Sequence, residues 1–316
     1  MSFSRKLIAG AAVVGLLSTV GVIPAEARPK NLARAVAQPD WLEQNIDNPK
    51  VRIIEVSTEP GIYERGHIKN SIKFVWHTDL VDTVNRDIIN QANFTALAQK
   101  AGINEDTTVV LYGDKNNWFA AWGAWIFNIY GQKDVRILDG GRVKWEKDGR
   151  ALTTAVPTFK AGNFNANPAD KNLRANIIKD VIPAAKKTKV AALIDIRSAD
   201  EFSGKIFAPA GFQELAVRAG HIPGAVNISW GQNVNADGTF KTVAELKKLY
   251  ADKGITGDDQ IITYCRIGER SSLTWFVLSE ILGFQKVKNY DGSWTEYGNT
   301  IGAPISNPSG TIWGAA

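Results

Sequence analysis

Cysteine is almost absent from the sequence, since Cys265 is the only one among 316 residues. One thiol cannot close an internal disulfide, and without a C-x-x-C pair a dithiol oxidoreductase is excluded. Histidine is also scarce, with three residues that stand far apart, His67, His77 and His221. Their spacing is not typical of metal ligands, so we expect neither a metal nor a cofactor.

Strong charge is lacking as well. The formal net charge of +5 is modest, and no basic stripe carries interleaved aromatic residues. Nucleic acid is therefore not an expected partner. The small positive net charge is compatible with a small anionic substrate but does not by itself indicate one. The hydrophobic content of 44% is typical of globular proteins, and the length suffices for two ordinary domains.

The N-terminus has the pattern of a secretory signal peptide, residues 1–27. Arg5 and Lys6 precede an apolar run from Leu7 to Val22, and Ala25-Glu26-Ala27 offers small residues for cleavage after Ala27. The run is short for a membrane span, although an uncleaved anchor is the alternative. We expect a periplasmic or secreted protein without stable membrane association after cleavage.

The remaining chain contains an internal repeat. At an offset of 152, Tyr112 aligns with Tyr264 and Gly140 with Gly292, while Gly66-His67-Ile68 meets Gly220-His221-Ile222 at 154. The second copy has about 14 extra residues before Gly220. A period of this size indicates a duplicated domain. We place the N-terminal copy at 28–157, a linker at 158–172 and the C-terminal copy at 173–316.

Strand and helix patterns alternate in both copies. The expected strands are Arg52–Val56, Thr108–Tyr112, Val135–Leu138, Ala192–Ile196, Ala225–Ile228, Gln260–Tyr264 and Lys286–Asn289. Helices are expected at Asn93–Ala101 and Trp118–Tyr130, and between a capping box at Thr242 and a terminating Gly254. This alternation predicts an α/β fold in which each copy is a doubly wound, mostly parallel sheet with helices on both faces.

Cys265 lies between an apolar strand pattern and an amphipathic helix pattern. A helix N-terminus and the nearby Arg266 and Arg270 predict a thiolate and an anionic ligand at the same site. The alternative is an inert, buried cysteine. In the N-terminal copy the equivalent residue is Gly113, in a loop with neither thiol nor arginine. That copy is expected to supply packing area and one wall of a cleft.

Several motifs of the C-terminal copy resemble those of the rhodanese sulfurtransferases of the tandem-domain form. They are Asp195-Ile196-Arg197 with Glu201-Phe202, Gly220-His221-Ile222-Pro223-Gly224-Ala225, Cys265-Arg266-Ile267-Gly268-Glu269-Arg270, and Asn289-Tyr290-Asp291-Gly292-Ser293-Trp294. Four residues separate the cysteine from the arginine of its loop, whereas tyrosine phosphatases have five, so the phosphatase pattern fails. Leu273 is a departure, because relatives often have histidine there.

The resemblance implies a thiosulfate sulfurtransferase in which Cys265 becomes a persulfide and then passes the sulfur to cyanide or to a thiol acceptor. Under it, Cys265 is the nucleophile, and the cradle is formed by Arg266, Ile267, Gly268, Glu269 and Arg270. One of the two arginines would hold the sulfite end of the donor. Asp195 would line the pocket, and Arg218 and Trp294 would border the cleft.

Other roles and activities stay open at this point. Arg197, Glu201 and His221 are expected to form a structural pairing network. The alternative enzyme is a 3-mercaptopyruvate sulfurtransferase, although the two loop arginines favour thiosulfate. The alternative from another class is a non-catalytic sulfur carrier or a redox-sensing thiol protein.

Overall fold

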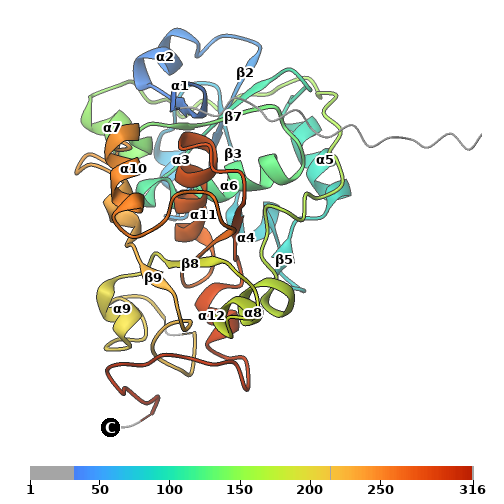
Figure 1. Cartoon of the computed structure of the whole chain (residues 1–316). Helices are drawn as coiled ribbons and strands as arrows, with labels where there is room; N and C mark the ends of the chain where they lie inside the picture. The colour runs from blue at the N-terminus through green and yellow to red at the C-terminus, as the bar shows by residue number, and fades with distance from the viewer. Residues whose placement is uncertain (1–31, 214, 315–316) are drawn as a thin grey trace, which may run out of the picture.

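The computed structural model describes residues 32–213 and 215–314, and each copy of the repeat contains one parallel sheet (Figure 1). The expected signal peptide, residues 1–27, lies outside the described residues. Within the part that is described, no helix is both long enough and apolar enough to cross a membrane.

The N-terminal sheet has the strand order β1-β7-β6-β2-β3, and all its pairs are parallel. Its strands are β1 (Val36–Ala37), β2 (Val51–Glu55), β3 (Ser71–Lys73), β6 (Thr108–Tyr112) and β7 (Asp134–Leu138). Helices α5 (Gln91–Lys100) and α6 (Trp118–Ile129) pack on one face, whereas α2 (Pro39–Gln44) and α7 (Gly141–Lys147) pack on the other. A short antiparallel pair, β4 (Val81–Asp82) and β5 (Asp87–Ile88), lies apart from the sheet.

The C-terminal sheet has the order β11-β10-β8-β9, again all parallel. Its strands are β8 (Ala192–Asp195), β9 (Val226–Asn227), β10 (Ile261–Tyr264) and β11 (Val287–Asn289). Helices α10 (Val243–Ala251) and α11 (Glu269–Phe276) cover one face, and α8 (Ile182–Ala185) and α12 (Ser293–Tyr297) cover the other. The predicted doubly wound, parallel architecture is therefore confirmed.

The remaining helices are short. They are α1 (Leu32–Ala35), α3 (Ile62–Arg65), α4 (Trp76–Asp79) and α9 (Ala199–Ser203), with 3-10 turns at Lys115–Asn117 and Trp230–Asn233 and π turns at Ile177–Val181 and Val277–Ile281. Apart from Val277–Ile281, which continues the helix pattern expected after Cys265, the sequence patterns did not predict these pieces, because elements of one turn show no apolar period.

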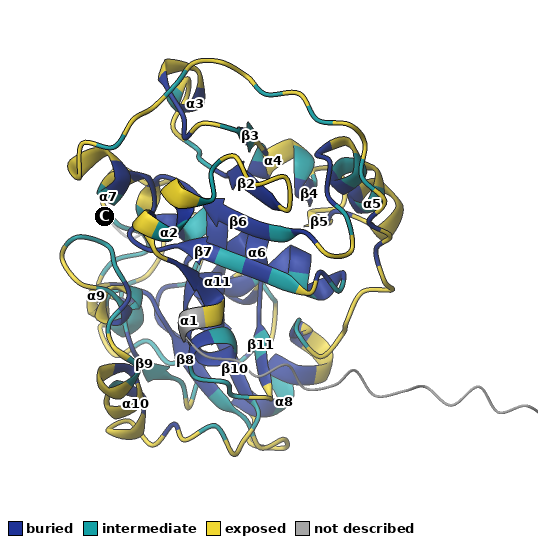
Figure 2. Cartoon of the chain, turned by 90° about the horizontal axis from the view of Figure 1, so that it is seen from above, coloured by how far each residue is buried: buried dark blue, intermediate teal, exposed yellow. Residues whose placement is uncertain are grey.

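The two copies share one apolar core. Helices α6 and α11 pack against each other, and the buried cluster continues from Trp122 and Trp125 to Phe276 and Val277 (Figures 1 and 2). Residues 158–172 contain no helix or strand, yet they pack on the N-terminal copy, where Phe164 is buried and its N–H donates to the Ile103 carbonyl. This shared core fixes the position of α11, at whose N-terminus Cys265 lies.

Candidate active site

Cys265 follows the last residue of β10, at the carboxyl edge of the sheet where parallel α/β proteins place ligands. The backbone N–H of Gly268, which caps α11, donates to the Cys265 Sγ at 3.1 Å. The thiol side chain is fully buried, with 0% of its surface exposed. Cys265 therefore sits in a backbone cradle at a helix N-terminus, as the loop pattern predicted.

Gly268 is required by the shape of this cradle. Its φ of +98° lies in the left-handed region, and a Cβ there would lie 2.6 Å from the Asp291 Cα and 2.7 Å from the Trp122 ring. Asp291 follows β11 in the C-terminal copy, whereas Trp122 belongs to α6 of the N-terminal copy. The N-terminal copy thus packs directly against the cysteine loop.

Ser293 completes the cradle from behind. Its Oγ accepts the Cys265 N–H at 3.0 Å, donates to the Tyr290 carbonyl at 2.7 Å and lies 4.0 Å from the Cys265 Sγ. The residue has a φ of +51°, an uncommon backbone conformation for serine. Ser293 was quoted only as part of a motif in the sequence. That motif was the available signal, but it did not show that the hydroxyl faces the cysteine.

Glu269 is the charged group nearest to the sulfur. The Cys265 Sγ lies 3.4 Å from the Glu269 Oε2, and Glu269 is 4% exposed. Burial raises the pKa of the Cys265 thiol, and the charge of Glu269 raises this pKa further; Arg270 and the loop N–H groups oppose both without overcoming them. The Glu269 carboxylate thus faces the thiol and disfavours the thiolate that the loop sequence predicted, a direction that the sequence did not show.

Arg270 is held by a buried ion pair. Its guanidinium donates to the two carboxylate oxygens of Glu201 at 3.1 and 3.2 Å, and its Nε lies 3.7 Å from the Glu269 Oε1. Burial alone would lower the Arg270 pKa, but the surrounding negative charges raise it. Because both terminal guanidinium nitrogens of Arg270 donate to Glu201, this structure shows Arg270 paired with that carboxylate and not free to hold the sulfite end.

The other two predicted cradle residues face different partners. Arg266 donates to the Gln213 carbonyl at 2.7 Å, and its guanidinium lies 5.3 Å from the Phe212 ring centre. Both partners lie in the segment that the N-terminal copy lacks. The Ile267 carbonyl accepts from Arg86 of the N-terminal copy at 2.9 Å. Arg86 was missed because 181 residues separate it from Ile267.

Three further predicted site residues are committed to internal contacts. Asp195 is fully buried in a bidentate pair with Arg197, whose Nη2 lies 2.6 Å from the Asp195 Oδ2. Arg218 donates to four backbone carbonyls, those of Tyr297, Gly298, Thr300 and Ala303. Trp294 is 1% exposed and donates its indole N–H to the Arg218 carbonyl. The predictions that Asp195 lines a pocket and that Arg218 and Trp294 border a cleft are corrected accordingly.

The expected network of Arg197, Glu201 and His221 divides into separate contacts. Arg197 pairs with Asp195, Glu201 pairs with Arg270, and the His221 ring stacks on Phe202 with ring centres 3.6 Å apart. His67 stacks on Tyr63 in the same way at 3.8 Å. The His221 ring therefore makes an internal packing contact, in line with the structural role expected for it, whereas Glu201 is joined to the cysteine loop.

The N-terminal copy cannot hold a side chain at the position equivalent to Cys265. A Cβ on Gly113 would lie 2.2 Å from the Val56 carbonyl oxygen. The Gly113 N–H donates to the Oδ1 of Asn117, which stands at the position equivalent to Glu269. The backbone packing of that loop therefore leaves no room for a cysteine side chain.

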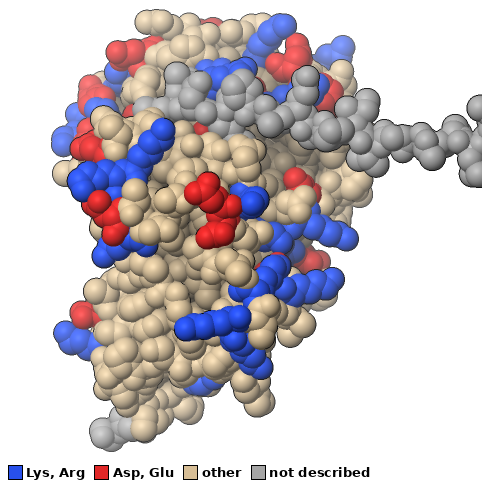
Figure 3. Space-filling view, viewed as in Figure 1, with Lys and Arg blue, Asp and Glu red and all other residues tan. Residues whose placement is uncertain are grey.

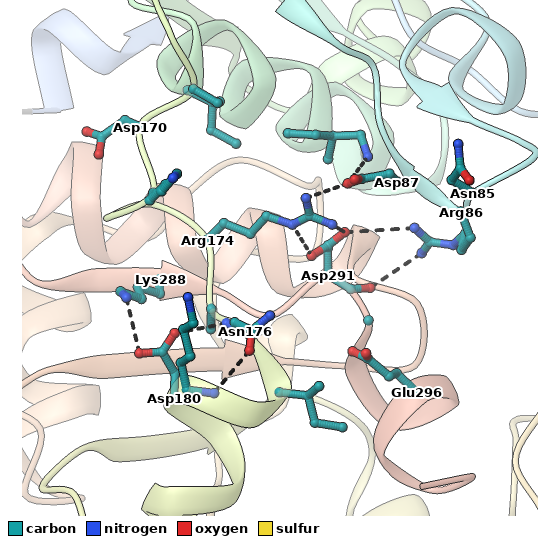
Figure 4. Close-up of a pocket in the computed structure, with 18 of the residues that line it drawn as sticks. Asn85, Arg86, Asp87, Asp170, Arg174, Asn176, Asp180, Lys288, Asp291 and Glu296 are labelled. Atoms are coloured by element: carbon teal, nitrogen blue, oxygen red, sulfur yellow. Dashed lines mark hydrogen bonds and ion pairs between the residues drawn. The ribbon is translucent and has the colours of Figure 1, made fainter.

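A cavity of about 950 Å³ lies between the two copies, but Cys265 does not line it (Figure 4). Arg174 bridges Asp87 and Asp291 across it, and Lys288 pairs with Asp180 on its opposite side. Lys and Arg side chains gather on this side of the molecule, near α8 (Figure 3). The cavity shares Asp291 and Gly292 with the segment behind the cysteine loop.

Comparison with known proteins agrees with this architecture. The model of the rhodanese-like domain matches residues 38–148 and 179–300. The chain belongs to the rhodanese-like family. Among the residues that the structure describes, no three His, Cys, Asp or Glu side chains group as metal ligands would.

Relatives of this rhodanese-like chain include a protein named "Putative thiosulfate sulfurtransferase" from Mycobacterium tuberculosis, 52% identical over 84% of this chain and 95% of that protein. The protein named "Sulfur carrier protein TtuD" from Thermus thermophilus is 48% identical over 84% of this chain and 94% of its own length. A solved structure, the 3-mercaptopyruvate sulfotransferase SseA from Escherichia coli, superposes with a TM-score of 0.69 at 27% identity, covering 82% of this chain and 98% of SseA. These names support a sulfurtransferase.

Proposed function

We propose that this rhodanese-like protein is a thiosulfate sulfurtransferase that carries the transferred sulfur on Cys265. The observation that supports this best is the cradle, in which the Gly268 N–H points at the Cys265 Sγ from the N-terminus of α11. Such a donor would stabilise the negative charge of a persulfide, and the helix dipole adds to it. The relatives named as thiosulfate sulfurtransferases support the same donor.

In the proposed reaction, the Cys265 sulfur attacks the outer sulfur of thiosulfate and sulfite leaves. An acceptor, either cyanide or a thiol, then removes that sulfur and regenerates Cys265. Arg266 is the loop arginine without a carboxylate partner within the described residues, so we assign the sulfite end of the donor to it. Because Cys265 is fully buried, donor entry requires a side chain over the sulfur to move.

Intact mass of the purified protein tests the proposal. We expect a gain of one sulfur after thiosulfate, loss of that sulfur after cyanide, and no gain in Cys265→Ser. Full thiosulfate:cyanide activity in Cys265→Ser would disprove a persulfide at this residue. The same spectra would show whether residues 1–27 are removed, as the proposed periplasmic or secreted location requires.

Two alternatives rest on the comparisons. The likeness to SseA favours 3-mercaptopyruvate as donor, and the likeness to TtuD favours a sulfur carrier. Steady-state kinetics with both donors separates the first, since a large preference in kcat/KM for mercaptopyruvate would replace thiosulfate. A carrier would form the persulfide but show no turnover with cyanide or small thiols.

A further inference from the structure

The thiol of Cys265 and the carboxyl group of Glu269 are in direct contact in a buried site. Their Sγ and Oε2 atoms are 3.4 Å apart, with exposures of 0% and 4% for the two residues. Two negative charges at this distance in a buried site strongly disfavour each other. A proton on either group removes this repulsion, and the 3.4 Å contact is short enough for the proton to pass directly between the two atoms.

The charged groups around this pair are few and well defined. Arg270 lies on the far side of Glu269, with its Nε 3.7 Å from Oε1, and Glu201 from α9 holds its guanidinium. Arg86 of the N-terminal copy reaches the same loop, but it binds the Ile267 carbonyl and Asp291. One oxygen of Glu269 is thus directed at Arg270 and the other at the thiol.

We propose that Glu269 accepts the Cys265 proton during attack on the sulfur donor and returns it when the acceptor removes the sulfur. This role rests on the proposed sulfurtransferase function. A bond forms between the Cys265 sulfur and the outer sulfur of thiosulfate, and the sulfur–sulfur bond of the donor breaks. Its electron pair leaves with sulfite, and the S–H proton moves to the Glu269 Oε2.

The second half of the cycle balances this transfer. The acceptor attacks the outer sulfur of the persulfide, and the electron pair of the sulfur–sulfur bond returns to Cys265. The Glu269 carboxyl then gives its proton back to the sulfur. The resting thiol and the ionised carboxylate are restored, and no outside oxidant or reductant is needed.

The N-terminal copy supplies an internal comparison. At the position equivalent to Glu269 it has Asn117, whose Oδ1 accepts the Gly113 N–H at 3.0 Å. The copy without a thiol therefore also lacks a titratable group at this position. In that loop, an amide oxygen is sufficient to accept the backbone N–H, and no carboxylate is needed.

The proposal predicts a distinctive pH dependence. The resting state, thiol with carboxylate, and the reactive state, thiolate with carboxylic acid, hold the same number of protons. Their ratio is therefore independent of pH. When the carboxylate is replaced by an amide, the reactive state holds one proton fewer than the resting state, so the rate should rise tenfold per pH unit until the thiol ionises.

Glu269→Gln, Glu269→Asp and a control, Glu64→Gln, test this. Glu64 lies in α3 of the N-terminal copy and forms an exposed pair with Lys73. Each full-length protein is mixed rapidly with thiosulfate at pH values from 6 to 9 and quenched, and persulfide formation is followed by intact mass. General base catalysis contributes about 10²–10⁴-fold, so we expect Glu269→Gln to be at least about 10²-fold slower at pH 6.

The expected profiles differ in shape as well as in height. The wild-type protein and Glu64→Gln should show nearly flat rates between pH 6 and 8, and Glu269→Gln should approach them near pH 9. Glu269→Asp keeps the base at a greater distance and should be slower but still flat. Recovery at high pH also shows that Glu269→Gln is folded.

Two outcomes would overturn the proton transfer alone. One is a flat Glu269→Gln profile at the wild-type rate, and the other is an equal loss at every pH, which indicates a structural role. A wild-type protein that gains no sulfur from thiosulfate or mercaptopyruvate would overturn the proposed function, and the role of Glu269 with it.

Discussion

Replacement of Glu201 by glutamine tests the buried pair that positions Arg270. Glu201 and Arg270 have side-chain exposures of 0% and 7%, and two hydrogen bonds join them. The Glu201 Oε2 also accepts the backbone N–H of Ser198 at 3.0 Å. Glutamine has one acceptor oxygen, so its NH₂ group would face either the Ser198 N–H or the guanidinium. Arg270 would keep its charge but lose the carboxylate that compensates it.

The size of the effect follows from burial. Breaking a buried ion pair by removing one partner costs about 3–5 kcal/mol, because an uncompensated charge remains inside. Glu269 still lies near Arg270, so we expect the lower end, about 3 kcal/mol. For a domain of about 150 residues, this lowers Tm by roughly 6–12 °C. Persulfide formation should also slow, since Arg270 adjoins Glu269.

The pH dependence of this loss has a defined sign. Burial opposes ionisation of Glu201, but the hydrogen bonds and charge of Arg270 outweigh it and lower the Glu201 pKa. A lowered folded pKa gives stability that is complete above the unfolded value of about 4.3 and disappears as pH falls through the folded value. The stability difference between wild type and Glu201→Gln should therefore be constant from pH 6 to 8 and shrink in acid.

Urea unfolding and thermal melts measure the loss, and Glu55→Gln is the matched control. Glu55 forms a comparably buried pair with Arg142 in the N-terminal copy, at 2.9 Å with exposures of 0% and 4%. Both variants should lose stability, but only Glu201→Gln should slow persulfide formation. A loss below about 1 kcal/mol for Glu201→Gln, or an equal fall in activity for both variants, would refute the reasoning.

Two further substitutions test how the N-terminal copy supports the loop. Gly268→Ala places a Cβ at a φ of +98° and within 2.7 Å of Trp122 and Asp291. We therefore expect the free energy of unfolding in urea to fall by about 1–3 kcal/mol and persulfide formation to slow. An unchanged stability and rate would contradict this strain argument. Arg86→Ala removes a hydrogen bond to the Ile267 carbonyl, donated by a side chain that is 45% exposed. We therefore expect a loss of only about 1 kcal/mol in stability but a clear change in the stopped-flow rate of persulfide formation. An unchanged rate would show that Arg86 does not belong to the site.

The long elements were predictable because burial sets their period. Thr108–Tyr112 was predicted with its observed bounds, and the capping box at Thr242 is present. Gly254 has the expected left-handed φ of +75°. These features depend on neighbours within a few residues, so one sequence contains enough information to place them.

The charge arrangement of the site could not be predicted in the same way. The loop sequence located the cradle at Cys265 but not the direction in which Glu269 points. The partner of Arg270 is Glu201, 69 residues away in a segment that had been assigned to another network. Whether a buried thiol ionises depends on such directions and distances, which local patterns do not contain.

The two copies share a scaffold contact but differ in the loop that follows it. In both copies, a tyrosine at the end of a central strand accepts the N–H of the Gly-His-Ile turn, at 3.0 Å from Ile68 to Tyr112 and at 3.2 Å from Ile222 to Tyr264. The loop that follows differs, because the Val56 carbonyl leaves no room for a side chain at Gly113, whereas the buried Cys265 side chain accepts the Gly268 N–H.

The N-terminal copy nevertheless belongs to the site. Its helix α6, which follows the Gly113 loop, places Trp122 against Gly268. Its β4–β5 turn carries Arg86, which donates to the Ile267 carbonyl. The C-terminal copy alone would expose the core face of α11 and lose both contacts on the cysteine loop. The copy without the cysteine therefore contacts the cradle at two points, and we expect the proposed chemistry to require both copies.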